Sequence, residues 1–131
     1  TWVSVGTLRP DIVAACTPHV LDVVVAGQDK PFIGVLAWPS MAEFQALMAE
    51  GPVALARLTE TLTERLKAFN ASAGGSSRRV GRFVIMTEPP SIDAGEITDK
   101  GYVNQRATLE RRADLVAGLY TNPPAPGVVS L

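Results

Sequence analysis

The chain has 131 residues, of which 47% are hydrophobic, and its formal net charge is −1 at pH 7. This length fits one domain with a single core and leaves no room for a second domain. Because the arginines are scattered among thirteen acidic residues, the chain has no general positive field, and nothing indicates a nucleic-acid partner. No apolar run approaches the roughly 18 residues that a bilayer crossing needs, so we expect no membrane partner.

The chain contains one cysteine, Cys16, and one histidine, His19. A lone cysteine cannot form an internal disulfide and is typical of a small buried thiol in a cytosolic protein. The two side chains are too few for a zinc site, and no third group is placed to orient a Cys–His nucleophile pair. The acidic residues of the loop at 93–99 lack the spacing of a calcium loop, so we expect no metal site.

The first third of the chain predicts one helix and three strands. Residues 2–5 alternate bulky and small side chains from Trp2 onward, which predicts a short strand. Apolar residues at helical spacing predict a helix over 8–16, in which Pro10 would lie in the tolerant first turn. Two apolar runs at 20–26 and 32–38, separated by a turn, predict neighbouring buried strands.

Two helices follow. Ser40 and Glu43 have the spacing of a capping box, which predicts a helix beginning at Met41. Gly51 and Pro52 end this helix and begin another. The second helix carries apolar residues at steps of three and four, so its apolar face is expected in the core and its charges in solvent: Leu55, Leu58, Leu62, Leu66 and Phe69.

A Gly- and Ser-rich loop at 73–77 precedes Arg78 and Arg79, and a strand is predicted over 80–86. A glycine-rich loop before arginines is compatible with phosphate binding, because guanidinium groups bind phosphate oxygens in pairs. The spacing of a nucleotide-binding P-loop is absent. A connector with solvated arginines remains the alternative.

The stretch at 89–106 is the best candidate for chemistry. It begins with two prolines, contains two glycines and carries Lys100, one of only three lysines in the chain. We expect a mobile arm in which Asp93, Glu96 and Asp99 solvate the loop and hold Lys100 protonated. Composition alone would make this lysine an ordinary surface charge.

Asn104 is placed to cap a last helix, whose apolar residues recur at helical spacing. Residues 121–131 are rich in proline and carry no charge, so we expect a loose tail there.

The run Pro-Pro-Ser-Ile-Asp-Ala-Gly-Glu-Ile-Thr-Asp-Lys-Gly-Tyr at 89–102, followed by Asn-Gln-Arg at 104–106, resembles the tenth core motif of the adenylate-forming acyl-CoA synthetases. Within that superfamily it is most similar to feruloyl-CoA synthetases, although Thr98 and Asp99 depart from the commoner spelling of the motif. The resemblance spans nearly the whole chain. It implies an α+β C-terminal lid domain over residues 1–120, with a small sheet of about three strands and a remnant of an N-terminal hairpin, flanked by helices.

The same resemblance implies a function. The chain would be a piece of a cytoplasmic, ATP-dependent acid–CoA ligase, and its partner would be a missing N-terminal adenylation domain that chiefly binds ATP, Mg²⁺ and an aromatic or other small carboxylic acid. Lys100 would assist adenylation. Arg78 and Arg79 would meet coenzyme A phosphates, and Trp2 would line the coenzyme A tunnel. Phe32 is the nearest match to a coenzyme A-contacting aromatic, with packing inside the domain as the alternative.

Two alternatives remain open. The chain could be a stand-alone α+β binding or oligomerisation module, in which the loop lysine is only solvated. Within the enzymes, the acyl group could be delivered to a carrier protein instead of free coenzyme A.

Overall fold

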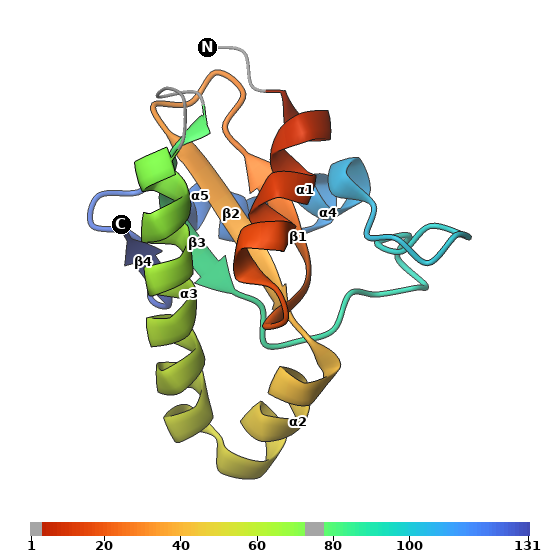
Figure 1. Ribbon diagram of the computed structural model, residues 1–131. Coiled ribbons are helices and arrows are strands. Elements are labelled where there is room, and N and C mark those ends of the chain that lie inside the picture. The colour runs from red at the N-terminus through yellow and green to blue at the C-terminus, as the bar shows by residue number, and fades with distance from the viewer. Residues whose placement is uncertain (1–3, 73–77) are drawn as a thin grey trace.

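The computed structural model describes residues 4–72 and 78–131, and in these residues a four-stranded sheet lies between two groups of helices (Figure 1). In Figure 1, α1 and α3 lie in front of the sheet, and α4 and α5 lie behind it. The elements follow in the order α1 (Val5–Cys16), β1 (Val20–Ala26), β2 (Ile33–Pro39), α2 (Met41–Glu50), α3 (Pro52–Ser72), β3 (Val80–Ile85), α4 (Gln105–Arg111), α5 (Ala113–Leu119) and β4 (Val128–Ser130). The predicted α+β class is confirmed.

The strands lie in the order β1-β2-β3-β4 across the sheet. Strands β1 and β2 are antiparallel, with Val24 opposite Leu36. Strand β3 runs parallel to β2, and the chain reaches it through α2 and α3, as a parallel pair requires a crossover connection. The short β4 returns antiparallel along β3.

Each central strand contributes alternate side chains to two separate cores. One core lies under α1 and α3 and includes Val23, Val35 and Phe83. The other lies under α5 and includes Leu36 and Leu119. Because both faces are covered, β2 is buried along its whole length, and this explains its unbroken apolar run.

Helix α1 begins earlier than predicted. The expected strand over 2–5 is wrong at its described end, since Ser4 caps α1 and its carbonyl accepts the N–H groups of Thr7 and Leu8 at 3.3 and 3.0 Å. Trp2 and most of the expected hairpin remnant lie outside the described residues. A two-step alternation over four residues is too short to exclude a helical turn. Pro10 therefore lies in the helix interior, above the solvent-exposed Gly6.

Helix α2 begins at Met41 as predicted, but its cap is only half of the expected box. Ser40 Oγ accepts the Glu43 N–H at 3.3 Å. The Glu43 carboxylate does not turn back to Ser40; its Oε2 lies 2.8 Å from His19 Nδ1. This contact ties the end of the α1–β1 connection to the start of α2.

The tail departs from the expectation of a loose segment, because Val128–Ser130 forms the fourth strand and pairs with residues 82–84 of β3. Three residues that follow Pro126 and Gly127 are too few to show a period in the sequence, so only the partner strand reveals this strand. The last predicted helix is also divided: α4 ends at Arg111 and α5 begins at Ala113. Of the helices in the described residues, none combines the length and apolar character that a membrane crossing requires.

Candidate functional site

The loop that carries Lys100 is a hairpin closed by backbone bonds. We call residues 97–103 the lysine hairpin. Ile97 and Val103 form an antiparallel bridge at its base. One step closer to the tip, the Thr98 N–H donates to the Tyr102 carbonyl at 2.8 Å.

Lys100 lies in the tight turn at the tip of this hairpin. The Gly101 N–H donates to the Thr98 carbonyl at 2.9 Å, and Gly101 has φ = 86°, which a residue with a side chain rarely adopts. The Lys100 side chain is exposed and forms no ion pair with any residue that the structure describes. The turn thus presents an uncommitted ammonium away from the core.

Glu96, at the base of the hairpin, was expected in solvent beside Lys100, and that expectation is wrong. Its carboxylate is 0% exposed and accepts hydrogen bonds from the Ser91 N–H at 2.7 Å, from Arg111 Nη1 at 3.1 Å, and from Arg112 Nε and Nη2 at 2.9 and 3.1 Å. Burial alone raises the pKa of Glu96. The Arg112 and Ser91 hydrogen bonds, with the charges of both arginines, outweigh it and hold the pKa below its usual value.

Arg112 joins three parts of the chain. It lies at the junction between α4 and α5, its side chain is 11% exposed, and its Nη1 also pairs with Glu88 at 3.0 Å. Its hydrogen bond with Glu96 raises the pKa of the guanidinium further. The start of the loop, the base of the hairpin and the helix junction are therefore held by one side chain.

Two more side chains tie this region to the edge strand β1. Arg9 of α1 donates through Nη2 to the Val103 carbonyl at 3.2 Å and through Nε to the Val23 carbonyl at 2.9 Å. The side-chain amide of Gln105 accepts a hydrogen bond from the Val25 N–H and donates one to the Val25 carbonyl. These contacts cover backbone groups that an open sheet edge would expose.

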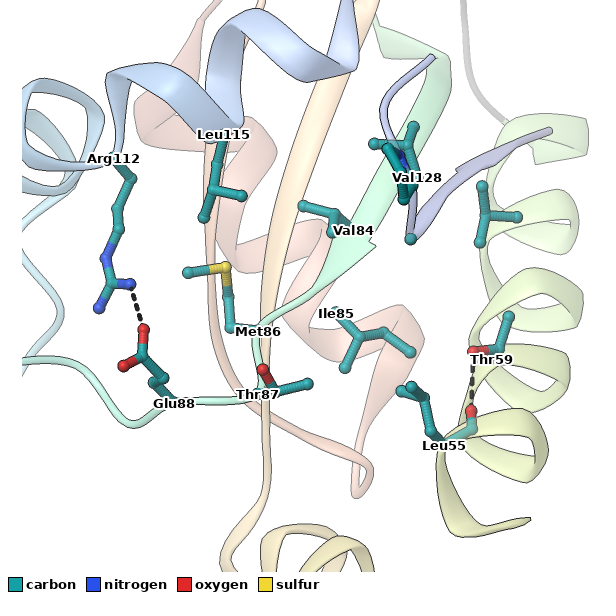
Figure 2. A pocket seen from close by; sticks show the side chains of 13 residues that line it. Leu55, Thr59, Val84, Ile85, Met86, Thr87, Glu88, Arg112, Leu115 and Val128 are labelled. Atoms are coloured by element: carbon teal, nitrogen blue, oxygen red, sulfur yellow. Dashed lines mark hydrogen bonds and ion pairs between the residues drawn. The ribbon is translucent and has the colours of Figure 1, made fainter. Parts of the chain in front are cut away.

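A cavity of about 490 Å³ lies beside Arg112, between α3, β3, α5 and β4. Figure 2 shows the Arg112–Glu88 pair on one side, with Leu55 and Thr59 of α3 on the opposite side. Thr59 Oγ1 is already bonded to the Leu55 carbonyl at 2.7 Å. Of the polar side chains that line this cavity, Arg112 and Glu88 are paired with each other, and Thr59 is bonded to the backbone.

The other predicted site residues lie apart from Lys100. Figure 1 shows the lysine hairpin projecting from one side of the domain and the start of β3 on the other. There, Arg78 is ion-paired with Asp11, whereas the exposed Arg79 lines a groove of about 460 Å³ together with Lys67.

Phe32 also lines this groove and is half-buried. Its ring packs on Tyr120, with centroids 4.7 Å apart, and the Arg82 guanidinium carbon lies 5.0 Å from its centroid. The expected packing of Phe32 inside the domain is thus largely what is seen. Trp2 lies outside the described residues.

Metal binding finds no support in this part of the chain. Within residues 4–72 and 78–131, no three His, Cys, Asp or Glu side chains meet in a way that could hold a metal ion. Cys16 is buried, and burial raises the pKa of its thiol to about 11. The thiol is therefore a poor nucleophile near neutral pH.

Sequence reasoning missed the pairing of Glu96 with Arg111 and Arg112. The signal was present in part, since two adjacent arginines, Arg111 and Arg112, lie fifteen and sixteen residues after Glu96, at the end of the following helix. Their spacing does not show that the helix would turn them back onto the loop.

Comparison with known proteins places the chain in a family. The model for the AMP-binding enzyme C-terminal domain matches residues 8–123. No curated protein sequence matches the chain.

Three solved structures share the fold. The A-PCP didomain of carboxylic acid reductase from Segniliparus rugosus, in complex with AMP, is 19% identical with a TM-score of 0.63, over 90% of this chain and 16% of its own. The adenylation domain of the carboxylate reductase from Mycobacterium chelonae is 16% identical with a TM-score of 0.63, over 90% and 18%. The A domain of the Segniliparus rugosus enzyme, with AMP and a co-purified carboxylic acid, is 17% identical with a TM-score of 0.65, over 94% and 19%.

The chain thus spans less than a fifth of the length of the structures that it matches. At these sequence identities, the similarity to the solved structures shows a shared fold and nothing further. The family model covers most of the chain, and the chain therefore belongs to the C-terminal domains of AMP-binding, adenylate-forming enzymes.

Proposed function

We propose that this domain is the mobile C-terminal part of an ATP-dependent acid–CoA ligase resembling feruloyl-CoA synthetases, and that it supplies Lys100 for the adenylation of an aromatic or other small carboxylic acid. The observation that carries the proposal is the position of Lys100. It lies at the exposed tip of a closed hairpin and has no ion-pair partner among the described residues. Such an ammonium is available to a partner surface.

In the first step, a carboxylate oxygen of the acid bonds to the α-phosphorus of ATP. The bond from that phosphorus to the bridging oxygen breaks, and pyrophosphate leaves. Negative charge gathers on the oxygens around the α-phosphorus. Lys100 stabilises this charge electrostatically and transfers no proton.

In the second step, the thiol sulfur of coenzyme A bonds to the acyl carbon as AMP leaves, and the thiol proton passes to solvent. The groove beside Arg79 supports a role for this side of the domain, because Arg79 and Lys67 are both exposed there. Arg78 is less available, since Asp11 already pairs with it. The whole domain must rotate between the two steps, so that one active site meets first the lysine hairpin and then this groove and Trp2.

The nucleotide and the metal are assigned to the preceding domain. Magnesium prefers carboxylate and phosphate oxygens, and the described residues offer no cluster of metal ligands. Nothing in the proposal requires this domain to hold Mg²⁺ by itself.

A second candidate differs in the acyl acceptor, which would be the thiol of a carrier protein. It is favoured by the fold shared with an A-PCP didomain of a carboxylic acid reductase. The two candidates make the same prediction for Lys100 and differ only in which thiol receives the acyl group.

The test is Lys100→Ala in the full-length enzyme. We expect ATP–pyrophosphate exchange to slow by at least about a hundredfold, the scale for loss of one preorganised charge. Thioester formation from supplied acyl-adenylate should persist. Lys30→Ala is the control, since it removes another exposed lysine, in the β1–β2 turn. Unchanged exchange in Lys100→Ala would disprove the assigned role.

A further inference from the structure

The proposed role of Lys100 requires the lysine hairpin to be held in place, although its outer surface makes little contact with the rest of the domain. Tyr102 is 68% exposed, and Ile92 in the preceding turn is 74% exposed. Packing of these side chains cannot orient the hairpin. Its orientation must come from its base.

Glu96 holds the base of the hairpin in place. The carboxylate accepts four hydrogen bonds while fully buried. Its backbone joins the two neighbouring turns, because its N–H donates to the Ser91 carbonyl at 2.9 Å and its carbonyl accepts the Asn104 N–H at 2.7 Å. Charge-assisted bonds of this kind are short and directional.

The two legs of the hairpin are tied to different parts of the core. Through Arg112, the Glu96 leg is joined to the junction of α4 and α5, and α5 packs on the sheet. Through Arg9, the Val103 leg is joined to α1 and β1. A hairpin held at both legs moves with the domain and does not swing by itself.

We infer that Glu96 is a positioning residue for adenylation: its buried carboxylate, gripped by Arg112 and Arg111, fixes the hairpin that carries Lys100. The inference rests on the proposed function of Lys100. It assigns the mobility of the lysine to rotation of the whole domain. Flexibility of the loop then lowers the rate of adenylation, because Lys100 samples misplaced positions.

The variant that tests this is Glu96→Gln in the full-length enzyme. Glutamine keeps the size of the side chain, but its amide nitrogen would face an arginine donor. Glu110→Gln is the matched control, since Glu110 also pairs with an arginine, Arg106, but both side chains are exposed and far from the core. Arg111→Gln is a milder variant that removes one of the four bonds and leaves Arg112 in place.

We expect Glu96→Gln to lower kcat for ATP–pyrophosphate exchange by about tenfold to a hundredfold, as a displacement of about 1 Å does. The KM for ATP and the formation of thioester from supplied acyl-adenylate should stay close to those of the parent enzyme. Amide hydrogen exchange should accelerate in residues 97–104 and stay unchanged in α3. Arg111→Gln should show the same pattern in smaller degree, and Glu110→Gln should behave as the parent.

The outcomes separate this inference from the proposal on which it rests. If Lys100→Ala abolishes exchange of pyrophosphate while Glu96→Gln and Arg111→Gln keep full rates, the positioning role is wrong and the role of Lys100 stands. If both half-reactions fall together in Glu96→Gln and hydrogen exchange rises throughout the domain, Glu96 is only structural. If Lys100→Ala itself is fully active, the proposed function fails and the positioning role fails with it.

Discussion

The substitution Arg112→Ala would leave the buried carboxylate of Glu96 without its main cationic partner. Arg112 supplies two of the four hydrogen bonds that Glu96 accepts. After the change, only the Ser91 N–H at 2.7 Å and Arg111 Nη1 at 3.1 Å remain. In the folded parent domain the Glu96 side chain is 0% exposed, so water does not solvate its carboxylate there.

The expected cost follows from these contacts. Removing one partner of a buried ion pair costs about 3–5 kcal/mol. Because two donors remain, we expect the lower end, about 3 kcal/mol. The lost pair with Glu88 adds less than about 0.5 kcal/mol, because Glu88 is 74% exposed. Adding Glu96→Gln should then restore at least about 1 kcal/mol, since the stranded charge is gone.

The pH dependence has a defined sign. The folded-state pKa of Glu96 lies below its unfolded value, so its stabilisation is fully present above about pH 4.3, the ordinary pKa of glutamate. It is lost as pH falls through the lower folded-state pKa. The groups that face Glu96 are Arg111 and Arg112, with Glu88 beyond them. In Arg112→Ala, the free energy of unfolding should fall less as the pH is lowered, because the main cause of the lowered Glu96 pKa is gone.

The assay is urea denaturation of the parent domain, both single variants and the double variant, at pH 7 and at several values below 5. The free energies of unfolding form a double-mutant cycle. A cost below about 0.5 kcal/mol for Arg112→Ala, or strictly additive effects of the two changes, would show that Arg112 and Glu96 do not form a stabilising buried ion pair.

Two further predictions concern packing and coenzyme A. Gly34→Ala should destabilise the domain by about 1–3 kcal/mol in thermal or urea unfolding, because its Cβ would lie 2.8 Å from Leu119 Cδ1; Gly6→Ala, with no atom within 4 Å, should be neutral or stabilising, and equal effects would contradict this. In the full-length enzyme, Arg79→Ala should raise the KM for coenzyme A more than Arg78→Ala does, because Arg79 lines the groove whereas Arg78 is ion-paired with Asp11. Steady-state kinetics measure both KM values, and pyrophosphate exchange should stay unchanged as the control. A larger rise in Arg78→Ala would contradict the assignment.

Local patterns predicted the elements that depend on local chemistry. The helix from Met41 followed from its cap, and the long helix α3 followed from its leucine period. Strands β1, β2 and β3 followed from apolar runs, of which β2 is buried throughout and β1 and β3 are buried mainly over their second halves. In each case the residues within one element carry the necessary information.

The rest depends on partners distant in the chain. Strand β4 exists because β3 offers it an edge, and three residues near prolines carry no period of their own. Glu96 lies in a polar loop, where a carboxylate is ordinarily solvated. Its burial is fixed by two arginines at the end of α4, whose approach to the loop is a property of the tertiary structure. Lys100 was identified by resemblance to a motif, and the structure adds its exposure and its position in the hairpin turn.

We propose that a positive charge at the tip of the lysine hairpin promotes adenylation, and chemical rescue tests this claim. In the full-length enzyme, Lys100→Cys should lose pyrophosphate exchange as Lys100→Ala does, and treatment with 2-bromoethylamine, which rebuilds an ammonium of nearly the same reach, should restore at least about a tenth of the parent rate, since most of the lost electrostatic stabilisation returns. Lys100→Ala treated with the same reagent should stay inactive. A fully modified Lys100→Cys enzyme that shows no recovery, or an unmodified one that retains full exchange, would contradict the claim.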